Sequence, residues 1–179
     1  IIGDAYTTVI RGTPELLIVL FAYFGSSIAV HWLMRLLTGK EVWVQVPVLL
    51  SGVAALAVIF AGYAAESIRG GMLAVPQGQI EAAEAFGLSA WARLKLVKIP
   101  LIWRHALPAL GNNWLSLIKS TSLVSLVSLE ELMRKCSLAA DQTGFYFRFY
   151  MVAALIYLCL TSVNVYVLSK LEKAARQSG

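Results

Sequence analysis

The chain has little charge, and this shortage limits what kind of protein it can be. Charged residues make up 14% of its 179 residues, against about 25% in an average soluble protein. A soluble domain with so few charged side chains would struggle to cover its surface, so the composition argues against an ordinary soluble fold. Because 59% of the residues are hydrophobic, the chain is expected to cross a membrane several times.

Motifs for nucleotide binding and hydrolytic catalysis are also absent. The sequence has no G-x-x-x-x-G-K-[ST] loop, no H-E-x-x-H pair and no G-x-S-x-G turn. Its cysteines, Cys136 and Cys159, lie in a polar and an apolar stretch, so neither a disulfide nor a zinc site is predicted. His31 and His105 have no second ligand at metal-binding spacing. We therefore expect no catalytic residue, metal or cofactor, and the chain itself is not expected to bind ATP phosphates.

Four segments are apolar enough for membrane helices, which need about 20 mainly apolar residues. They are residues 16–34, 42–65, 105–129 and 149–169. Thr13 is expected to cap the first, with Pro14 at its first position and Glu15 at the positive end of the helix dipole. The third is the least regular of the four because it contains a proline, a glycine and a lysine. The predicted fold is an all-α polytopic membrane bundle.

The net charge of +5 does not call for a nucleic-acid partner, because basic residues at the ends of membrane spans hold the cytoplasmic side. The larger group of Lys and Arg falls on one side of the spans: Arg11, Arg69, Arg93, Lys95, Lys98, Arg104, Lys170, Lys173 and Arg176. The smaller group falls on the other side: Arg35, Lys40, Arg134, Lys135 and Arg148. This bias places residues 81–100 and the C-terminus in the cytoplasm.

The longest polar interruption between apolar segments, residues 81–100, is predicted to form two short helices around a glycine. Pro76 suits the first turn of a helix, and Gly87 can adopt the left-handed conformation that ends it. Ser89 is the expected N-cap of a second helix, which Pro100 is expected to stop. An amphipathic loop lying on the membrane surface is the alternative interpretation.

This segment resembles the EAA loop of inner-membrane permease subunits of ABC importers: Glu-Ala-Ala, three residues, Gly, nine residues, an aliphatic residue, one residue, then aliphatic-Pro. The chain has Glu81-Ala82-Ala83, Gly87, Val97 and Ile99-Pro100 at those spacings. Other stretches resemble the polar amino-acid branch, most of all the histidine and lysine/arginine/ornithine permeases. They are Arg11-Gly12-Thr13-Pro14, Arg69-Gly70-Gly71, Val75-Pro76-Gln77-Gly78-Gln79, Gly111-Asn112-Asn113-Trp114 and Lys119-Ser120-Thr121.

The resemblance implies a type I transmembrane domain of an ABC importer, a single permease domain over residues 1–179 with a cytoplasmic coupling loop at about 69–104. Four spans of a usual five are visible, since the chain begins Ile1-Ile2 with neither an initiator Met nor a signal peptide. The implied partners are a cytoplasmic ATPase, a second permease subunit, a periplasmic solute-binding protein and the lipid bilayer of a bacterial inner membrane. The residues implied to contact the ATPase are Glu81, Ala82, Ala83, Glu84, Gly87, Ser89 and Pro100.

The implied substrate is histidine or a basic amino acid such as arginine, lysine or ornithine, or an opine derived from one. A lysine within a span marks a solute pathway by default, but Lys119 can also snorkel to the interface or pair within the bundle. A cationic solute would need an acidic group near this lysine, for which Glu66 is the candidate. The candidate pathway residues are Asn112, Asn113, Lys119, Ser120, Thr121 and Glu66, although hydrogen bonds between helices are the favoured interpretation of the amides.

Glu130, Glu131 and Arg134 follow the third span on the outer side. They form either a docking surface for the binding protein or a solvated helix end with weak local pairs. An integral-membrane enzyme is the first rival, but it would need a carboxylate, His or Cys cluster at membrane depth. The second rival is a channel or secondary transporter working without an ATPase, which has no use for a rigid cytoplasmic helix pair.

Overall fold

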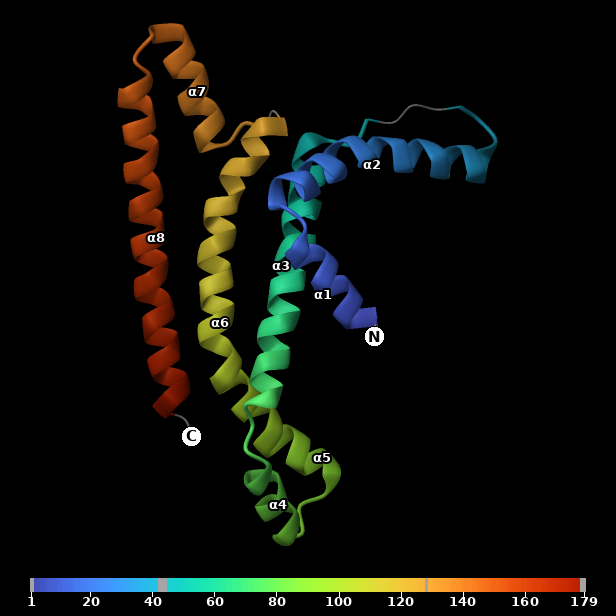
Figure 1. Ribbon diagram of the computed structural model, residues 1–179, viewed down its shortest axis with the longest axis vertical. Coiled ribbons are helices and arrows are strands. Elements are labelled where there is room, and N and C mark those ends of the chain that lie inside the picture. The colour runs from blue at the N-terminus through green and yellow to red at the C-terminus, as the bar shows by residue number, and fades with distance from the viewer. Residues whose placement is uncertain (1, 42–44, 128, 178–179) are drawn as a thin grey trace. The chain divides into compact units, whose positions relative to one another are not determined.

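The computed structural model describes residues 2–41, 45–127 and 129–177, and within these ranges the chain is helical with no strand (Figure 1). The expected all-α fold is confirmed. In chain order the α-helices are α1 Ile2–Gly12, α2 Glu15–Thr38, α3 Val48–Leu73, α4 Gln77–Ala85, α5 Ala90–Arg93, α6 Ile99–Ser120, α7 Leu132–Thr143 and α8 Tyr146–Gln177. A π-helix, Leu94–Lys98, joins α5 to α6, and a 3₁₀-helix, Thr121–Val127, follows α6.

Three helices are long and apolar enough to cross a membrane among the residues that were described: Glu15–Thr38, Val48–Leu73 and Tyr146–Ala175. They correspond to three of the four predicted segments, and α3 runs further than expected, to Leu73 rather than residue 65. The segment predicted at 105–129 is divided instead, because α6 starts earlier at Ile99 and gives way to 3₁₀ geometry after Ser120. Helix α6 is not one of the three apolar helices, because it contains polar side chains such as Arg104 and Asn112.

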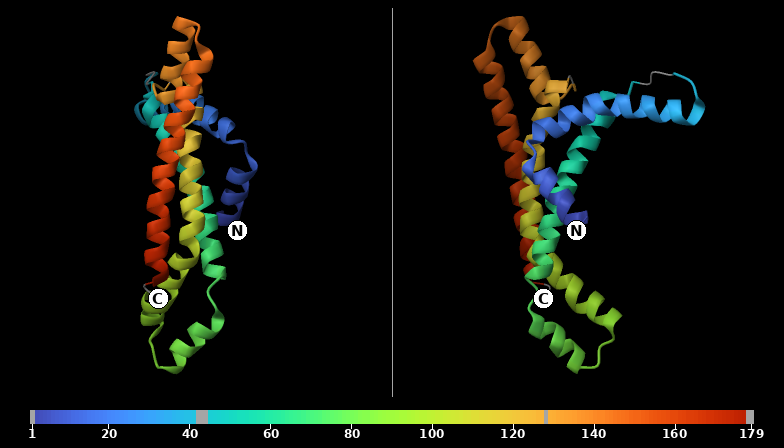
Figure 2. Two further views of the ribbon diagram at one scale, coloured as in Figure 1. Left: turned by 90° about the vertical axis from the view of Figure 1, so that its left-hand side faces the viewer. Right: turned by 45° about the vertical axis from the view of Figure 1, so that its right-hand side comes forward.

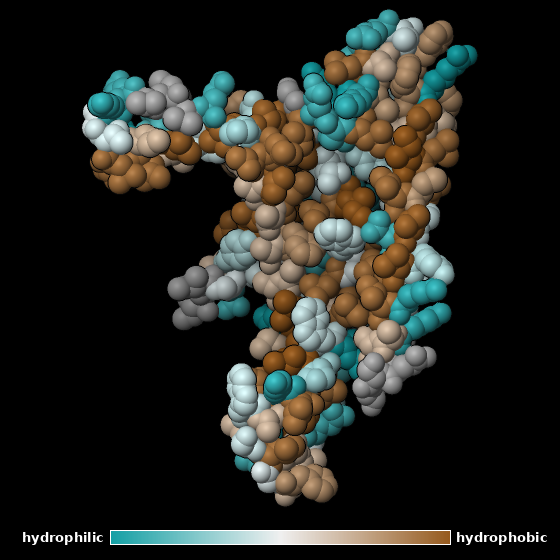
Figure 3. Space-filling model, turned by 180° about the vertical axis from the view of Figure 1, so that it is seen from behind, coloured by the Kyte–Doolittle hydropathy of each residue, from teal (hydrophilic) through white to brown (hydrophobic). Residues whose placement is uncertain are grey.

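The long helices leave most of their apolar surface uncovered by the rest of the chain. Within their most apolar stretches, α2 and α8 bury 6% of their residues and α3 buries 28%. Figure 3 shows hydrophobic side chains along the long helices and hydrophilic ones gathered mainly near their ends. Exposed apolar area on this scale is unfavourable in water. These faces therefore require lipid or other apolar protein surfaces around them.

Contacts between residues divide the chain into two compact units. The first comprises Ile1–Gly62 and Ser116–Leu160, and the second comprises Tyr63–Leu115 and Thr161–Gly179. The interpretation of the whole chain as one permease domain stays a prediction.

In the first unit, small residues let helices approach α3 closely. A Cβ added at Gly52 would lie 2.7 Å from Cγ1 of Val124, and one at Gly62 would lie 2.7 Å from Cγ2 of Ile10. The hydroxyl of Tyr6 also donates to the carbonyl oxygen of Val58 at 2.7 Å. Helix α1, which the sequence analysis did not assign to a span, therefore packs against the middle of an apolar helix.

The expected cap at the start of α2 is wrong. The hydroxyl of Thr13 donates to the carbonyl of Val9 at 2.7 Å, one turn back in α1. Pro14 occupies the N-cap position instead, with no side-chain cap bond. The reason is local, since the carbonyl of Val9 at the end of α1 offers the Thr13 hydroxyl an acceptor within its own turn.

In the second unit, α6 packs on the last turns of α3 through another glycine. A Cβ added at Gly71 would lie 2.8 Å from the Cβ of Ala106 and 2.9 Å from the carbonyl oxygen of Ile102. Ala106 is 1% exposed. Further along α6, Gly111 is buried and faces Leu168 of α8. These glycines explain how the helices of this unit reach contact distance, because a larger residue would hold the backbones apart.

Candidate functional sites: the 77–98 hairpin and the end of α6

The hairpin of residues 77–98, α4 followed by α5 and the π-helix, has a rigid turn. Gly87 has a φ of 77°, the left-handed conformation predicted for it. Its N–H donates to the carbonyl of Glu84 at 2.8 Å, and the N–H of Leu88 donates to the carbonyl of Ala83 at 3.1 Å. These two bonds make the Schellman arrangement, which satisfies the last carbonyls of a helix.

The second arm of the hairpin begins as predicted and is tied to the first. Ser89 is the N-cap of α5, and its side chain accepts from the N–H of Ala92 at 3.3 Å. Arg93 forms an ion pair with Glu84 of α4. The two further views in Figure 2 agree that α4 and α5 lie side by side. A groove lined by residues of both arms runs between them, formed by Ile80, Ala90, Arg93, Leu94 and Lys98.

The hairpin exposes large apolar side chains although its composition is polar. Phe86 is 88% exposed and Trp91 is 71% exposed. Glu81 and Ala82 are also exposed, whereas Ala83 is buried and only 6% exposed. Ala83 therefore packs inside the hairpin, just before its turn, and its side chain is not on the exposed surface. Exposed aromatic residues on a rigid support are the usual centre of a protein contact surface.

Pro100 does not stop the second helix, contrary to the prediction. The chain passes from α5 through the π-helix directly into α6, and Ile99, just before the proline, has φ −59° and ψ −49°, in the α-helical region that a following proline normally disfavours. The N–H of Ile99 bonds to the carbonyl of Leu94, five residues back. The wider π turn makes room for the proline ring, which in a regular helix would strike the carbonyl four residues earlier.

At the end of α6, the residues predicted for a solute pathway meet a partner that was not predicted. Lys119 is exposed. The hydroxyl of Ser120 donates to Oε2 of Glu15, the first residue of α2, at 2.6 Å. The hydroxyl of Thr121 turns back to the carbonyl of Ile118 at 2.6 Å. No signal in the sequence links Glu15 to Ser120, because the two residues lie 105 positions apart.

The intramembrane amides mainly join helices of the second unit. The side-chain nitrogen of Asn113 donates to Oγ of Ser67 at 2.8 Å, and Nε1 of Trp114 donates to Oδ1 of Asn164 at 3.1 Å. The bond between helices expected of such amides is confirmed for Asn113, and Asn164 makes a second bond of this kind. Asn112 is exposed.

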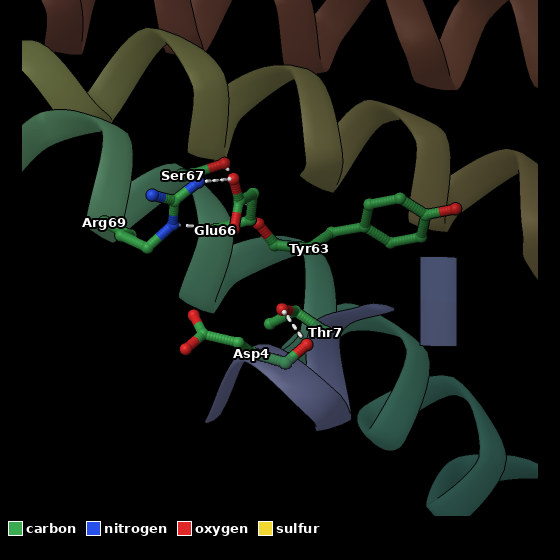
Figure 4. Close-up of polar contacts among 6 residues, drawn as sticks. All are labelled: Asp4, Thr7, Tyr63, Glu66, Ser67 and Arg69. Atoms are coloured by element: carbon green, nitrogen blue, oxygen red, sulfur yellow. Dashed lines mark hydrogen bonds and ion pairs between the residues drawn. The ribbon is translucent and has the colours of Figure 1, made fainter. Parts of the chain in front are cut away.

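Glu66 has a basic partner on its own helix. Arg69 donates through Nε to Oε2 of Glu66 at 3.0 Å and through an amino nitrogen to Oε1, so the pair is bidentate (Figure 4). A two-pronged guanidinium–carboxylate pair is among the stronger ion pairs in proteins. The predicted pairing of Glu66 with Lys119 stays a prediction.

Among the residues predicted to contact the binding protein, Glu131 accepts hydrogen bonds from other residues of the chain through its carboxylate. It is the N-cap of α7 and accepts from the N–H groups of Met133 at 2.9 Å and Arg134 at 2.8 Å. Tyr157 of α8 donates to its Oε2 at 3.2 Å. Glu131 therefore joins two helices, whereas the neighbouring Glu130 is exposed.

Comparison with known proteins finds relatives along nearly the whole chain. The family described as "Binding-protein-dependent transport system inner membrane component" matches residues 2–172. The nopaline transport system permease protein NocQ of Agrobacterium fabrum is 44% identical over 177 residues, 99% of this chain and 75% of the relative. The arginine ABC transporter permease protein ArtQ of Escherichia coli K12 is 43% identical over 184 residues, 97% of this chain and 77% of the relative.

One further relative and one solved structure mention histidine in their names. The histidine/lysine/arginine/ornithine transport system permease protein HisQ of Salmonella typhimurium is 38% identical over 173 residues, 97% of this chain and 75% of the relative. A solved structure titled "Crystal structure of an amino acid ABC transporter with histidines" matches with a TM-score of 0.78 and 33% identity. That match covers 96% of this chain and 74% of the other. The chain belongs to the family of binding-protein-dependent transport system inner-membrane components.

Proposed function

We propose that this chain is the permease subunit of an ATP-driven importer that moves basic amino acids, or opines derived from them, across a bacterial inner membrane. The names of its relatives support this substrate class: arginine, histidine/lysine/arginine/ornithine, nopaline and octopine. The subunit itself performs no catalysis. A partner hydrolyses ATP, since the chain has no phosphate-binding loop of its own.

The observation that carries the proposal is the construction of the 77–98 hairpin. Its turn is fixed by Gly87, its second arm is capped by Ser89, and an ion pair joins the arms. A rigid hairpin with exposed Phe86 and Trp91 suits docking on a folded partner. The partner is the cytoplasmic ATPase, and closing of two ATPases would move the paired permeases between inward- and outward-open states.

Within this scheme the hairpin residues have different tasks. Glu81 and Ala82, both exposed, contact the ATPase. Gly87 and Ser89 fix the shape, while Pro100 opens α6 beyond the π turn. The hairpin and the C-terminus face the cytoplasm, which labelling of single cysteines from either side of the membrane can test.

The uncovered apolar faces of α2 and α8 support a second permease subunit, identical or closely related, together with lipid. Glu130 and Arg134 are the candidates for contact with the periplasmic binding protein. Asn112, Lys119 and Thr121 line the solute pathway in this proposal. The preference for Lys119 as a pathway residue follows from its place near the end of an irregular helix at membrane depth.

The experiment compares two substitutions at Gly87 that differ in backbone preference. No atom lies within 4 Å of a Cβ added there, so only the positive φ matters. Left-handed geometry costs an L-residue about 1–2 kcal/mol, more for a β-branched residue and least for Asn. Gly87→Val should therefore lower substrate-stimulated ATP hydrolysis and uptake severalfold in the reconstituted complex, with normal membrane insertion, whereas Gly87→Asn should retain most of both.

Gly78→Ala is the matched control, because Gly78 lies within α4, has no positive φ and has open space around it. It should leave coupling unchanged. Full coupling in Gly87→Val would contradict the role of the hairpin. Uptake at full rate with no ATPase bound would contradict the importer itself and favour a channel or secondary transporter.

A further inference from the structure

Glu15 lies alongside the apolar helix α3, although it starts a helix of its own. The helix before it, α1, packs through Ile10 against Gly62 in the middle of α3. Its partner Ser120 precedes Val124 by about one turn, and Val124 packs against Gly52 near the start of α3. Along the axis of α3, Glu15 therefore lies between Gly62 and Gly52, beside the apolar part of that helix and not beside a loop.

The carboxylate of Glu15 is held by a hydroxyl and not by a cation. Ser120 donates to Oε2 at 2.6 Å, and among the described residues no Lys, Arg or His forms an ion pair with Glu15. The N-terminus of α2 favours a negative charge there. Glu15 is half-buried, and among the described residues none donates to its second oxygen, Oε1. Ionisable side chains at this depth are costly and usually serve a solute route.

The residue that precedes Ser120 is basic, and it also lacks an ion pair among the described residues. Lys119 directly precedes Ser120, and consecutive side chains leave a helix roughly 100° apart. Over the part of the chain that the structure describes, Lys119 forms no ion pair with Glu15 or with any other residue. The hydroxyl of Ser120 thus links Glu15 to the residue next to Lys119, and the ammonium and the carboxylate do not neutralise one another. A basic amino acid carries a carboxylate for the first and a cationic side chain for the second.

We propose that Glu15 is the specificity-determining residue for this pathway: its carboxylate receives the guanidinium or ammonium of the solute side chain, and Ser120 is a positioning residue that holds the carboxylate. Lys119 faces the solute carboxylate. This inference rests on the proposed function, because it assumes that a basic amino acid crosses the bundle. It replaces Glu66, whose carboxylate is paired with Arg69, as the acidic group of the route.

The test uses the complete complex of permeases, ATPase and binding protein in liposomes, with radiolabelled arginine and histidine at pH 8. At this pH arginine is cationic and free histidine is mainly neutral in its side chain, whose unperturbed pKa is about 6.5. The same binding protein loads every variant, so its own selectivity cancels in the ratio of variant to wild type. Glu15→Gln keeps the size and an acceptor for Ser120 but removes the charge.

We expect Glu15→Gln to lower arginine uptake about tenfold, the equivalent of about 1.4 kcal/mol, and to change histidine uptake at pH 8 much less. Glu15→Asp keeps the charge and should preserve the preference for arginine. Ser120→Ala should raise KM for arginine more than it lowers the maximal rate. Equal losses for both solutes would show that Glu15 has only a structural role, and no loss in Glu15→Gln would show that its charge is not needed. Either result would overturn the inference.

Two controls separate the possible failures. If the wild-type complex takes up neither solute, the proposed function fails and not only the role of Glu15. If Glu15→Gln does not assemble, binding to the wild-type permease–ATPase complex without binding protein decides the question. Histidine affinity relative to arginine should rise severalfold between pH 8 and pH 5.5, as the free imidazole gains its proton, and a constant ratio would overturn the inference.

Discussion

Two adjacent glycines in α3 offer a direct test of how tightly α6 packs against it. A methyl group at Gly71 would lie 2.8 Å from the Cβ of Ala106 and 2.9 Å from the carbonyl oxygen of Ile102, whereas Gly70 has nothing within 4 Å. Carbon atoms pack at about 3.5–4.0 Å. Gly71→Ala therefore forces the two helix backbones apart by roughly 0.7–1 Å, because the carbonyl it meets belongs to the backbone and cannot rotate away.

Overpacking of this kind costs typically about 1–3 kcal/mol. Replacing Gly by Ala inside a helix gains about 0.5–1 kcal/mol, and this gain is shared by both substitutions. The difference in stability between Gly71→Ala and Gly70→Ala thus isolates the overlap, and we expect about 1–3 kcal/mol in favour of Gly70→Ala. For chains of 150–250 residues, each kcal/mol shifts the midpoint of thermal unfolding by about 2–4 °C.

The measurement is the unfolding midpoint of the detergent-purified complex, followed by tryptophan fluorescence, with uptake assayed in parallel. Gly71→Ala should unfold several degrees below Gly70→Ala and transport less. Equal midpoints and equal uptake for the two variants would refute the close approach of α3 and α6 at this level.

Three other substitutions test separate parts of the chain. Glu131→Ala removes the cap of α7 and the acceptor for Tyr157, and the loss of a helix cap costs about 0.5–2 kcal/mol. Amide hydrogen exchange at the start of α7 should therefore be faster in this variant. Glu131→Gln should retain part of the protection. Gly52→Ala places a methyl group 2.7 Å from Val124, whereas Gly25→Ala meets nothing within 4 Å. Only the former should lower the unfolding midpoint, and a drop in both would argue against this contact. Ser89→Ala should loosen the first turn of α5, seen as faster proteolysis of the hairpin, and unchanged proteolysis would deny the cap a role.

The sequence predicted best where neighbouring residues decide the structure. Gly87 and Ser89 were assigned from turn and cap preferences, and both have the expected geometry. The apolar helices were predictable for the same reason, because a stretch of about 20 apolar residues indicates a membrane-spanning helix by its length and composition alone. Helix type, the turn of the hairpin and its second cap are all properties of short stretches.

Prediction failed where a distant or unusual partner decides. Pro100 was expected to end a helix, but a π turn before it removes the clash on which that rule depends. Thr13 was expected to cap α2, yet the end of α1 takes its hydroxyl. The bond between Glu15 and Ser120 depends on how α2 meets the end of α6, and no local preference of either residue encodes it.

The self-contained bonding of the 77–98 hairpin has a consequence for biosynthesis. All of its fixing bonds join residues fewer than a dozen positions apart, such as Glu84 with Arg93 and Ala83 with Leu88. Contacts so close along a chain form quickly. The hairpin can therefore fold as it leaves the ribosome, before α8 has been synthesised. Under the proposed function, the ATPase would then meet a finished docking element on a permease whose last helix is still being translated.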